Sequence, residues 1–198
     1  EAAKVEGTWA LLIHNKRLAF GCLCIFVYVG AEVGIASIMV NYLALPRTLG
    51  VLPVAAGLLV GRYWLGAMIG RMLGGFLLRL TAPGRLLAIF SGGAIAFISI
   101  SAFSSGSLAG YALVAVGLAN SIMFPTIFSL ATEGMTDEAP QASGLLCTAI
   151  VGGAIIPLLM GAVSDEVSLT ASLIVPVFCY VVIASYGLWA ARQQPTHS

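Results

Sequence analysis

Three charged side chains lie inside long apolar stretches and are the first candidates for chemistry: Glu32, Arg62 and Arg71. A charge near the centre of a bilayer costs about 2.5–3.5 kcal/mol, so each one needs a reason. A carboxylate accepts two hydroxyl hydrogen bonds, and Glu32 is therefore expected either to bind a polyol or to carry a coupling proton. The alternative is a structural ion pair with Arg62, which we place at a similar depth on the next stretch. For Arg71, a position near the helix end, from which the side chain either snorkels to the membrane surface or holds a gate at that end, is preferred to substrate contact.

Uncharged polar side chains in the same stretches give a second set of candidates. Asn120 is expected near the centre of the fourth stretch and Asn41 near the outer end of the first. An amide in lipid either holds helices together or binds substrate, and both interpretations stay open. Tyr28 is one helical turn before Glu32 and shares its face, so it is a further candidate beside a packing role. Pro125 follows Asn120 closely and can loosen the helix there.

The sequence offers no residues for hydrolytic or metal chemistry. The histidines, His14 and His197, lie in polar flanks, so no Ser–His or Cys–His pair is expected within the apolar stretches. The chain has no P-loop, which excludes ATP-driven transport by this chain alone. The cysteines lack metal-ligand spacing and are interpreted as small packing residues: Cys22, Cys24, Cys147 and Cys179. We therefore predict no enzyme, no catalytic residue, no metal and no cofactor.

Composition places these residues in a membrane. Hydrophobic residues make up 60% of the chain and charged residues only 9%, whereas soluble domains carry about 25% charged residues. The excess apolar surface must face lipid, so the bilayer is the expected surroundings. The net charge of +1 and the lack of a basic stripe exclude nucleic acid as a partner.

Six apolar stretches are each close to the ~20 residues needed to cross a bilayer. Because only helices satisfy their own backbone in lipid, and alternating strands are absent, we predict an all-α bundle. The predicted spans are 18–43, 54–78, 86–104, 107–131, 142–164 and 170–191, between end segments 1–17 and 192–198.

The distribution of basic residues predicts the orientation of the bundle. One side holds Lys4, Lys16, Arg17, Arg79, Arg85 and Arg192, and the other holds Arg47. Both ends of the chain are therefore expected in the cytoplasm. The six spans also divide into two similar triplets that enter from opposite sides, which predicts two inverted three-helix repeats. Within the second span, the Gly66, Gly70 and Gly74 spacing gives a smooth face for close helix packing.

Several sequence strings together resemble a known family. The first span carries Tyr28–Val33 and ends in Asn41-Tyr42, and the second carries Ile69-Gly70-Arg71-x-x-Gly74-Gly75. The fourth span carries 125–130, and the fifth carries 149–157 followed by 160–165. These strings resemble the second half of the fucose permease family, especially its glucose/galactose transporter branch. The resemblance runs in order from about Arg17 to Arg192.

The resemblance implies a major facilitator fold in which two six-helix halves rock around a central sugar site. Such proteins are secondary symporters in the cytoplasmic membrane of bacteria, driven by protons or by sodium, and glucose and galactose are expected ahead of fucose as substrate. The resemblance points again to Glu32, Asn41 and Asn120 as cavity residues, and adds Thr148. It also likens the segment from Gly70 to Arg85 to the inner-gate loop, with Arg71, Arg79 and Arg85 as its basic residues.

The family's first half is missing from the chain, which begins at Glu1 rather than Met. Alternating access needs two halves, so the expected partner is an N-terminal six-helix half. The chain is then either a fragment or a split subunit. The competing hypothesis is a structural or regulatory six-helix subunit that does not transport. A six-helix channel is disfavoured because no span carries a polar stripe along its full length.

Overall fold

The computed structural model describes residues 7 and 10–193, so Lys4, His197 and the outermost ends of the predicted terminal segments lie outside the described residues. Within that part, six helices are long and apolar enough to cross a membrane. They are built from α2 (Lys16–Ala44), α3 (Pro53–Leu80), α4 (Pro83–Phe103), α5 (Gly106–Asn120), α6 (Met123–Thr132), α7 (Ala139–Thr148), the 3-10 helix η1 (Ala149–Val151), α8 (Gly152–Glu166), the 3-10 helix η2 (Ala171–Leu173) and α9 (Ile174–Gln193).

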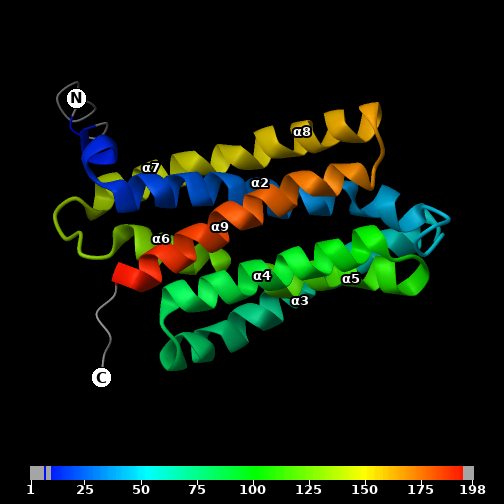
Figure 1. The fold of residues 1–198 in the computed structure, drawn as a ribbon, viewed down its shortest axis with the longest axis horizontal. Helices are drawn as coiled ribbons and strands as arrows, with labels where there is room; N and C mark the ends of the chain where they lie inside the picture. Colours follow the sequence, from blue (N-terminus) through cyan, green and yellow to red (C-terminus); the bar gives the residue numbers. More distant parts are fainter. Residues whose placement is uncertain (1–6, 8–9, 194–198) are drawn as a thin grey trace.

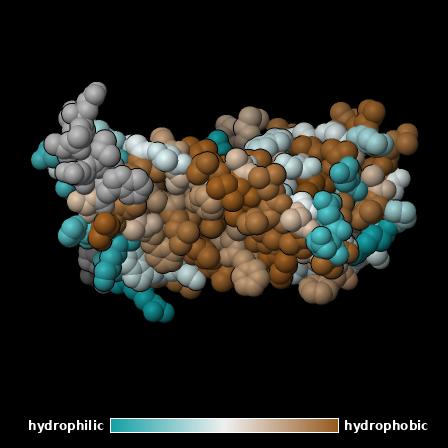
Figure 2. Space-filling model, turned by 90° about the horizontal axis from the view of Figure 1, so that it is seen from above, coloured by the Kyte–Doolittle hydropathy of each residue, from teal (hydrophilic) through white to brown (hydrophobic). Residues whose placement is uncertain are grey.

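The helices lie roughly side by side along the long axis of the molecule, and short connections lie at its two ends (Figure 1). The face over α7, α8 and α2 shows a broad apolar belt between polar groups at either end (Figure 2). This is the surface that a bilayer requires, with apolar side chains at hydrocarbon depth and polar ones at the interfaces. The predicted all-α bundle of six spans is confirmed.

The ends of the helices follow from local sequence. Asn15 is the N-cap of α2, and its Oδ1 accepts a 3.0 Å hydrogen bond from the Leu18 amide. Pro53 and Pro83 begin α3 and α4 at positions where a missing N–H costs nothing. At the opposite end from Asn15, the Arg47 guanidinium donates at 2.9 Å to the Ala102 carbonyl in the last turn of α4 and at 2.9 Å to Thr170 Oγ1 just before η2.

Two spans that the sequence predicts as single helices are interrupted. The fourth breaks at Ser121–Ile122, between α5 and α6. Pro125 explains this break, because its ring clashes with the carbonyl four residues earlier and it has no N–H to donate there. The fifth span passes through η1 just before Gly152-Gly153, which are poor helix formers.

Three helix pairs approach so closely that only glycine fits at the crossing. A Cβ on Gly152 of α8 would lie 1.9 Å from the Phe26 carbonyl oxygen of α2. A Cβ on Gly117 of α5 would lie 2.1 Å from the Tyr63 carbonyl oxygen of α3. At Gly84 of α4 the obstacle is a carbonyl oxygen of α9, 2.6 Å away. The first crossing joins the first span to the fifth, and the second crossing joins the fourth span to the second. The predicted inverted repeat, which relates span one to span four and span two to span five, interchanges these two crossings.

Candidate functional site

A cavity of about 380 Å³ lies at the flank of the bundle, in the middle of the spans. Four elements contribute to its wall: α2, α3, α6 and η1. The lining residues are Tyr28, Val29, Glu32, Arg71, Phe124, Pro125 and Ile150. The first, second, fourth and fifth spans therefore meet here, around one carboxylate, one guanidinium and one phenol.

Glu32 and Tyr28 form the polar centre of this wall. Their spacing of four residues places them on one face of α2, and the Tyr28 hydroxyl donates to Glu32 Oε1 at 2.8 Å. The same hydroxyl lies 3.0 Å from the Asn120 carbonyl oxygen at the end of α5. Tyr28 is buried, whereas Glu32 keeps part of its surface exposed. The carboxylate is therefore oriented by the bundle and still accessible from the cavity.

Arg71 lies in the same cavity and is tied to the helix break. Its Nε donates a 3.2 Å hydrogen bond to the Ser121 carbonyl oxygen. In an unbroken helix that carbonyl would accept from residue 125, which here is a proline without an N–H. Arg71 thus replaces the missing donor with its Nε, and its terminal N–H groups remain for other acceptors. The Ser121 carbonyl, which has no helical donor because residue 125 is proline, therefore holds the Arg71 side chain beside the cavity.

The predicted pairing of Glu32 with Arg62 is not present in the structure. Among the described residues the ion pair found is Arg17–Glu133, and it is Arg71 that shares the cavity with Glu32. Arg62 and Arg71 are nine residues apart, which at about 100° per residue puts them on opposite sides of α3. The depth of Arg62 along the helix is compatible with pairing, but its direction around the helix axis is not.

Asn120 is fully buried and does not line the cavity. Its Nδ2 donates to the Tyr63 hydroxyl at 2.7 Å, and its Oδ1 accepts from the Tyr180 hydroxyl at 2.6 Å. The Tyr63 hydroxyl in turn lies 3.2 Å from the Glu32 carbonyl oxygen. The amide joins α5 to α3 and α9, which favours the packing interpretation over substrate binding. Sequence reasoning missed Tyr63 and Tyr180, whose partners become visible only when the spans are packed.

The remaining predicted site residues lie away from the cavity wall. Asn41 is exposed near the end of α2. Thr148 is exposed at the end of α7, where its hydroxyl donates to the Gly144 carbonyl at 2.9 Å. Arg79 and Arg85 are exposed where α3 ends and α4 begins. These four residues remain predictions for the site, and the wall instead gains Val29, Phe124 and Ile150.

An ion pair that was not predicted from the sequence links two helices at one end of the bundle. The Arg17 guanidinium at the start of α2 contacts the Glu133 carboxylate just after α6. The Tyr186 hydroxyl of α9 lies 3.4 Å from the Arg17 carbonyl oxygen, adding a third helix to this contact. Within the described ranges no group of three His, Cys, Asp or Glu side chains could hold a metal.

Comparison with known proteins defines the class. No protein-family model matches the chain. The glucose/galactose transporter of Brucella abortus biovar 1 (strain 9-941) is 44% identical over 177 residues, covering 89% of this chain and 43% of that protein. The L-fucose-proton symporter of Escherichia coli (strain K12) is 31% identical over 186 residues, covering 91% of this chain and 41% of that protein.

A solved structure shows the same architecture. The crystal structure of the major facilitator superfamily transporter FucP in the outward conformation matches with a TM-score of 0.89 and 28% identity, over 96% of this chain and 45% of that chain. The chain thus spans less than half the length of these relatives.

The protein is a multi-pass membrane protein whose six helices form one half of a major facilitator fold. It is similar to sugar transporters, with a higher identity to the glucose/galactose transporter than to the L-fucose-proton symporter. These relatives are transporters rather than enzymes, in agreement with the absence of catalytic motifs from the sequence.

Proposed function

We propose that the chain supplies the C-terminal half of a cation-coupled monosaccharide transporter, for glucose and galactose or for fucose, that works by alternating access in the cytoplasmic membrane. The first, second, fourth and fifth spans would form one wall of the sugar site. An N-terminal six-helix half would form the other. Both termini would lie in the cytoplasm, as the basic side chains at the ends of α3, α4 and α9 favour.

The observation that carries this proposal is the polar cavity on the flank of the bundle. Glu32 is partly exposed and Arg71 exposed, although both belong to membrane spans. Exposing these charged side chains to the hydrocarbon of the bilayer would cost several kcal/mol, so water or protein must cover this face of the bundle. A second half enclosing an aqueous sugar site satisfies that need. The names of the relatives supply the substrate class.

Sugar recognition would combine the Glu32 carboxylate with the aromatic rings beside it. A carboxylate accepts two adjacent hydroxyls, while the terminal N–H groups of Arg71 donate to a ring or hydroxyl oxygen. Phe124 borders the same cavity and packs against Tyr28 with ring centroids 6.3 Å apart, so it provides an apolar surface for the carbon face of the ring. Glu32 would also carry the coupling proton, because its Tyr28 partner is a hydroxyl that can donate or accept.

The test is sugar accumulation by the complete protein in membrane vesicles under an imposed proton or sodium gradient. Glu32→Ala should abolish uptake, because both the hydroxyl acceptor and the proton carrier are lost. Glu32→Gln keeps the shape but has no titratable proton, so gradient-driven accumulation should fall at least tenfold while sugar exchange without a gradient declines less. Asp137→Asn, in an exposed connection, is the matched control and should accumulate normally.

Normal accumulation in both Glu32 variants, at equal amounts of inserted protein, would exclude this site. A different result would favour a structural or regulatory subunit: no measurable transport by the unaltered complete protein, together with failed insertion or assembly of the Glu32→Gln variant. A gradient of only one ion that drives accumulation identifies the coupling cation.

A further inference from the structure

A second hollow lies between α3, α4 and α5 and has an entirely apolar wall. Its volume is about 280 Å³, against about 150 Å³ for a cavity that accommodates a benzene ring. Glycines at Gly70 and Gly93 leave room for it, and Phe90 and Phe97 form much of the α4 side. We call it the α3–α4 groove, and all of its lining residues are apolar or glycine.

The α3–α4 groove opens away from the polar cavity. Leu73 lines the groove and Arg71 lines the cavity, yet they are two residues apart on α3. At about 100° per residue these side chains point about 200° apart, to opposite sides of the helix. No residue of α4 lines the polar cavity. The groove therefore opens on the side of α3 away from the polar cavity. Arg62 shares that side but lies eleven residues from Leu73, about 16 Å farther along the helix, so lipid can cover the groove itself.

The groove extends along α4 over most of the thickness of one leaflet. Ile89 and Phe97, two of its α4 residues, are separated by eight residues, or about 12 Å along the helix. Half of a hydrocarbon core is about 15 Å thick. Ile89 and Leu77 lie within two turns of the connection between α3 and α4, so the groove begins near the membrane surface and runs toward its centre.

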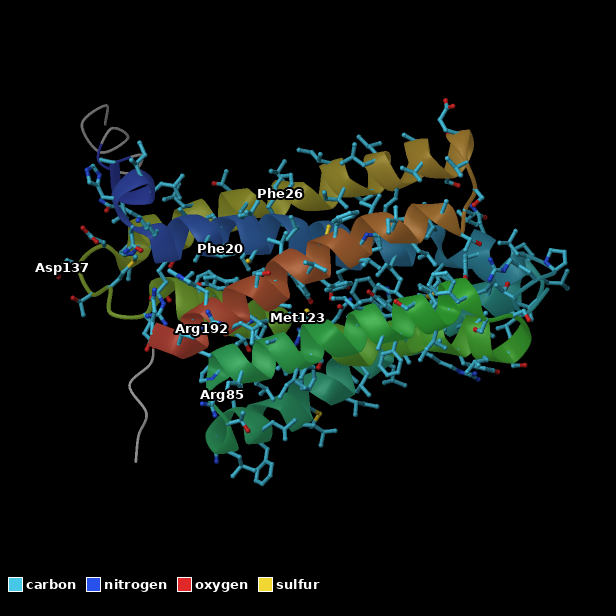
Figure 3. The ribbon with its side chains drawn as sticks, viewed as in Figure 1. Phe20, Phe26, Arg85, Met123, Asp137 and Arg192 are labelled. Atoms are coloured by element: carbon cyan, nitrogen blue, oxygen red, sulfur yellow. The ribbon has the colours of Figure 1, made fainter. Side chains whose placement is uncertain are left out.

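A cationic group lies at the surface end of the groove. Arg85 is in the first turn of α4, its side chain is exposed, and it lies four residues before the groove residue Ile89, on the same face of the helix. Arg85 lies at the end of the bundle where the two helices join (Figure 3). The N-cap of α4 is Ala82, which makes no side-chain capping bond, so amide groups of the first turn remain for an anion.

We propose that the α3–α4 groove binds one acyl chain of an anionic phospholipid whose phosphate is held by Arg85 and the free amide groups at the start of α4. An apolar slot alone would accept any chain. Arg85, together with the uncapped helix start beside it, adds the charge that selects an anionic headgroup. This site does not depend on the sugar-transport proposal, because it lies on the other side of α3.

The first test fills the groove. A Cβ on Gly93 would meet no atom within 4 Å, and Gly93 lines the groove, so Gly93→Leu introduces a large apolar side chain at the groove wall. Gly92 is equally open but does not line the groove, which makes Gly92→Leu the matched control. The complete protein is purified in detergent, given phosphatidylglycerol or phosphatidylcholine with identical acyl chains, and analysed by native mass spectrometry. Gly93→Leu should lose the retained phosphatidylglycerol, and Gly92→Leu should keep it.

The second test removes the charge without altering the groove. Arg85→Gln should lower the preference for phosphatidylglycerol over phosphatidylcholine by about fivefold, the effect expected of one surface cation. Lys16→Gln removes an exposed charge at the same end of the bundle and should change nothing.

Equal retention of the two lipids by the unaltered protein would overturn the proposal. So would equal losses in the Gly92 and Gly93 variants, or an unchanged preference in Arg85→Gln. Because Arg85 is exposed, its variant decides the matter even if Gly93→Leu fails to fold.

Discussion

The Tyr28 hydroxyl lies 2.8 Å from Oε1 of Glu32 and 3.0 Å from the carbonyl oxygen of Asn120. A tyrosine has one O–H proton and cannot fully donate to both acceptors. An ionised Glu32 attracts that proton more strongly, because hydrogen bonds to a charge are the stronger ones. A protonated Glu32 can itself donate to Tyr28, which releases the tyrosine proton for the carbonyl. Protonation of Glu32 is thereby linked to hydrogen bonding where α5 ends.

Replacing Tyr28 with phenylalanine should break this link while leaving the ring in place. We expect gradient-driven sugar accumulation to fall about tenfold, the typical worth of a hydrogen bond to a charged group, with a smaller effect on gradient-independent exchange. Uptake into vesicles with and without an imposed gradient measures both. Tyr42→Phe is the control, since that buried tyrosine also donates to a backbone carbonyl, at 2.8 Å, but lies outside the cavity. Equal losses in the two variants would contradict a special role for Tyr28.

Substitutions of Arg62 and Arg71 in α3 should have different effects on transport. Arg71 shares the cavity with Glu32 and supports the Ser121 carbonyl, so Arg71→Gln should reduce transport tenfold or more. Arg62 is on the other side of the helix, and Arg62→Gln should retain most of the activity. Initial uptake rates at equal amounts of inserted protein make the comparison. A larger loss of uptake in the Arg62 variant than in the Arg71 variant would favour the Glu32–Arg62 pairing that was predicted from depth alone.

The contrast between these arginines shows what the sequence could and could not predict. Apolar length and composition predict six spans, because a helix in lipid must satisfy its own backbone. The same one-dimensional information gives the depth of Arg62 and Arg71. It does not say which flank of α3 turns toward Glu32, since that depends on how neighbouring helices pack. The glycine stripe at Gly66, Gly70 and Gly74 does mark the packed face, and from it the two arginines can be placed on opposite flanks.

The polar network around Asn120 was beyond the sequence for a related reason. Glu32 and Tyr28 are close in sequence, so their shared face follows from helix geometry. Asn120, Tyr63 and Tyr180 come from three spans, and an amide of suitable depth fits a substrate site as well as a packing site. Only the rotation of each span decides between them. Here it turns the amide into the bundle, where two tyrosines use its donor and acceptor.

Asn120→Ala should therefore act on stability before it acts on sugar affinity. Removal of the amide leaves the buried Tyr180 hydroxyl without its acceptor, at a cost of about 1–3 kcal/mol, while the Tyr63 hydroxyl keeps the Glu32 carbonyl as a partner. The expected result is a lower unfolding temperature in detergent and less inserted protein, with the KM of the surviving protein little changed. Asn41→Ala, at an exposed position, should leave the unfolding temperature unaltered. A raised KM at normal stability would make Asn120 a substrate ligand after all.

Two glycines of α8 should respond to the same substitution in opposite directions. A Cβ on Gly152 would lie 1.9 Å from the Phe26 carbonyl oxygen, and because both groups are backbone, α2 and α8 would have to move apart. Gly152→Ala is expected to cost about 1–3 kcal/mol, as other overpacked sites do. Gly161 has no atom within 4 Å of the added carbon, so Gly161→Ala gains only helix propensity, up to about 1 kcal/mol. Thermal unfolding followed by size-exclusion chromatography compares the pair. If both variants unfolded at the same temperature, the close crossing of α2 and α8 would not be a determinant of stability, and the bundle would tolerate more separation there than its geometry implies.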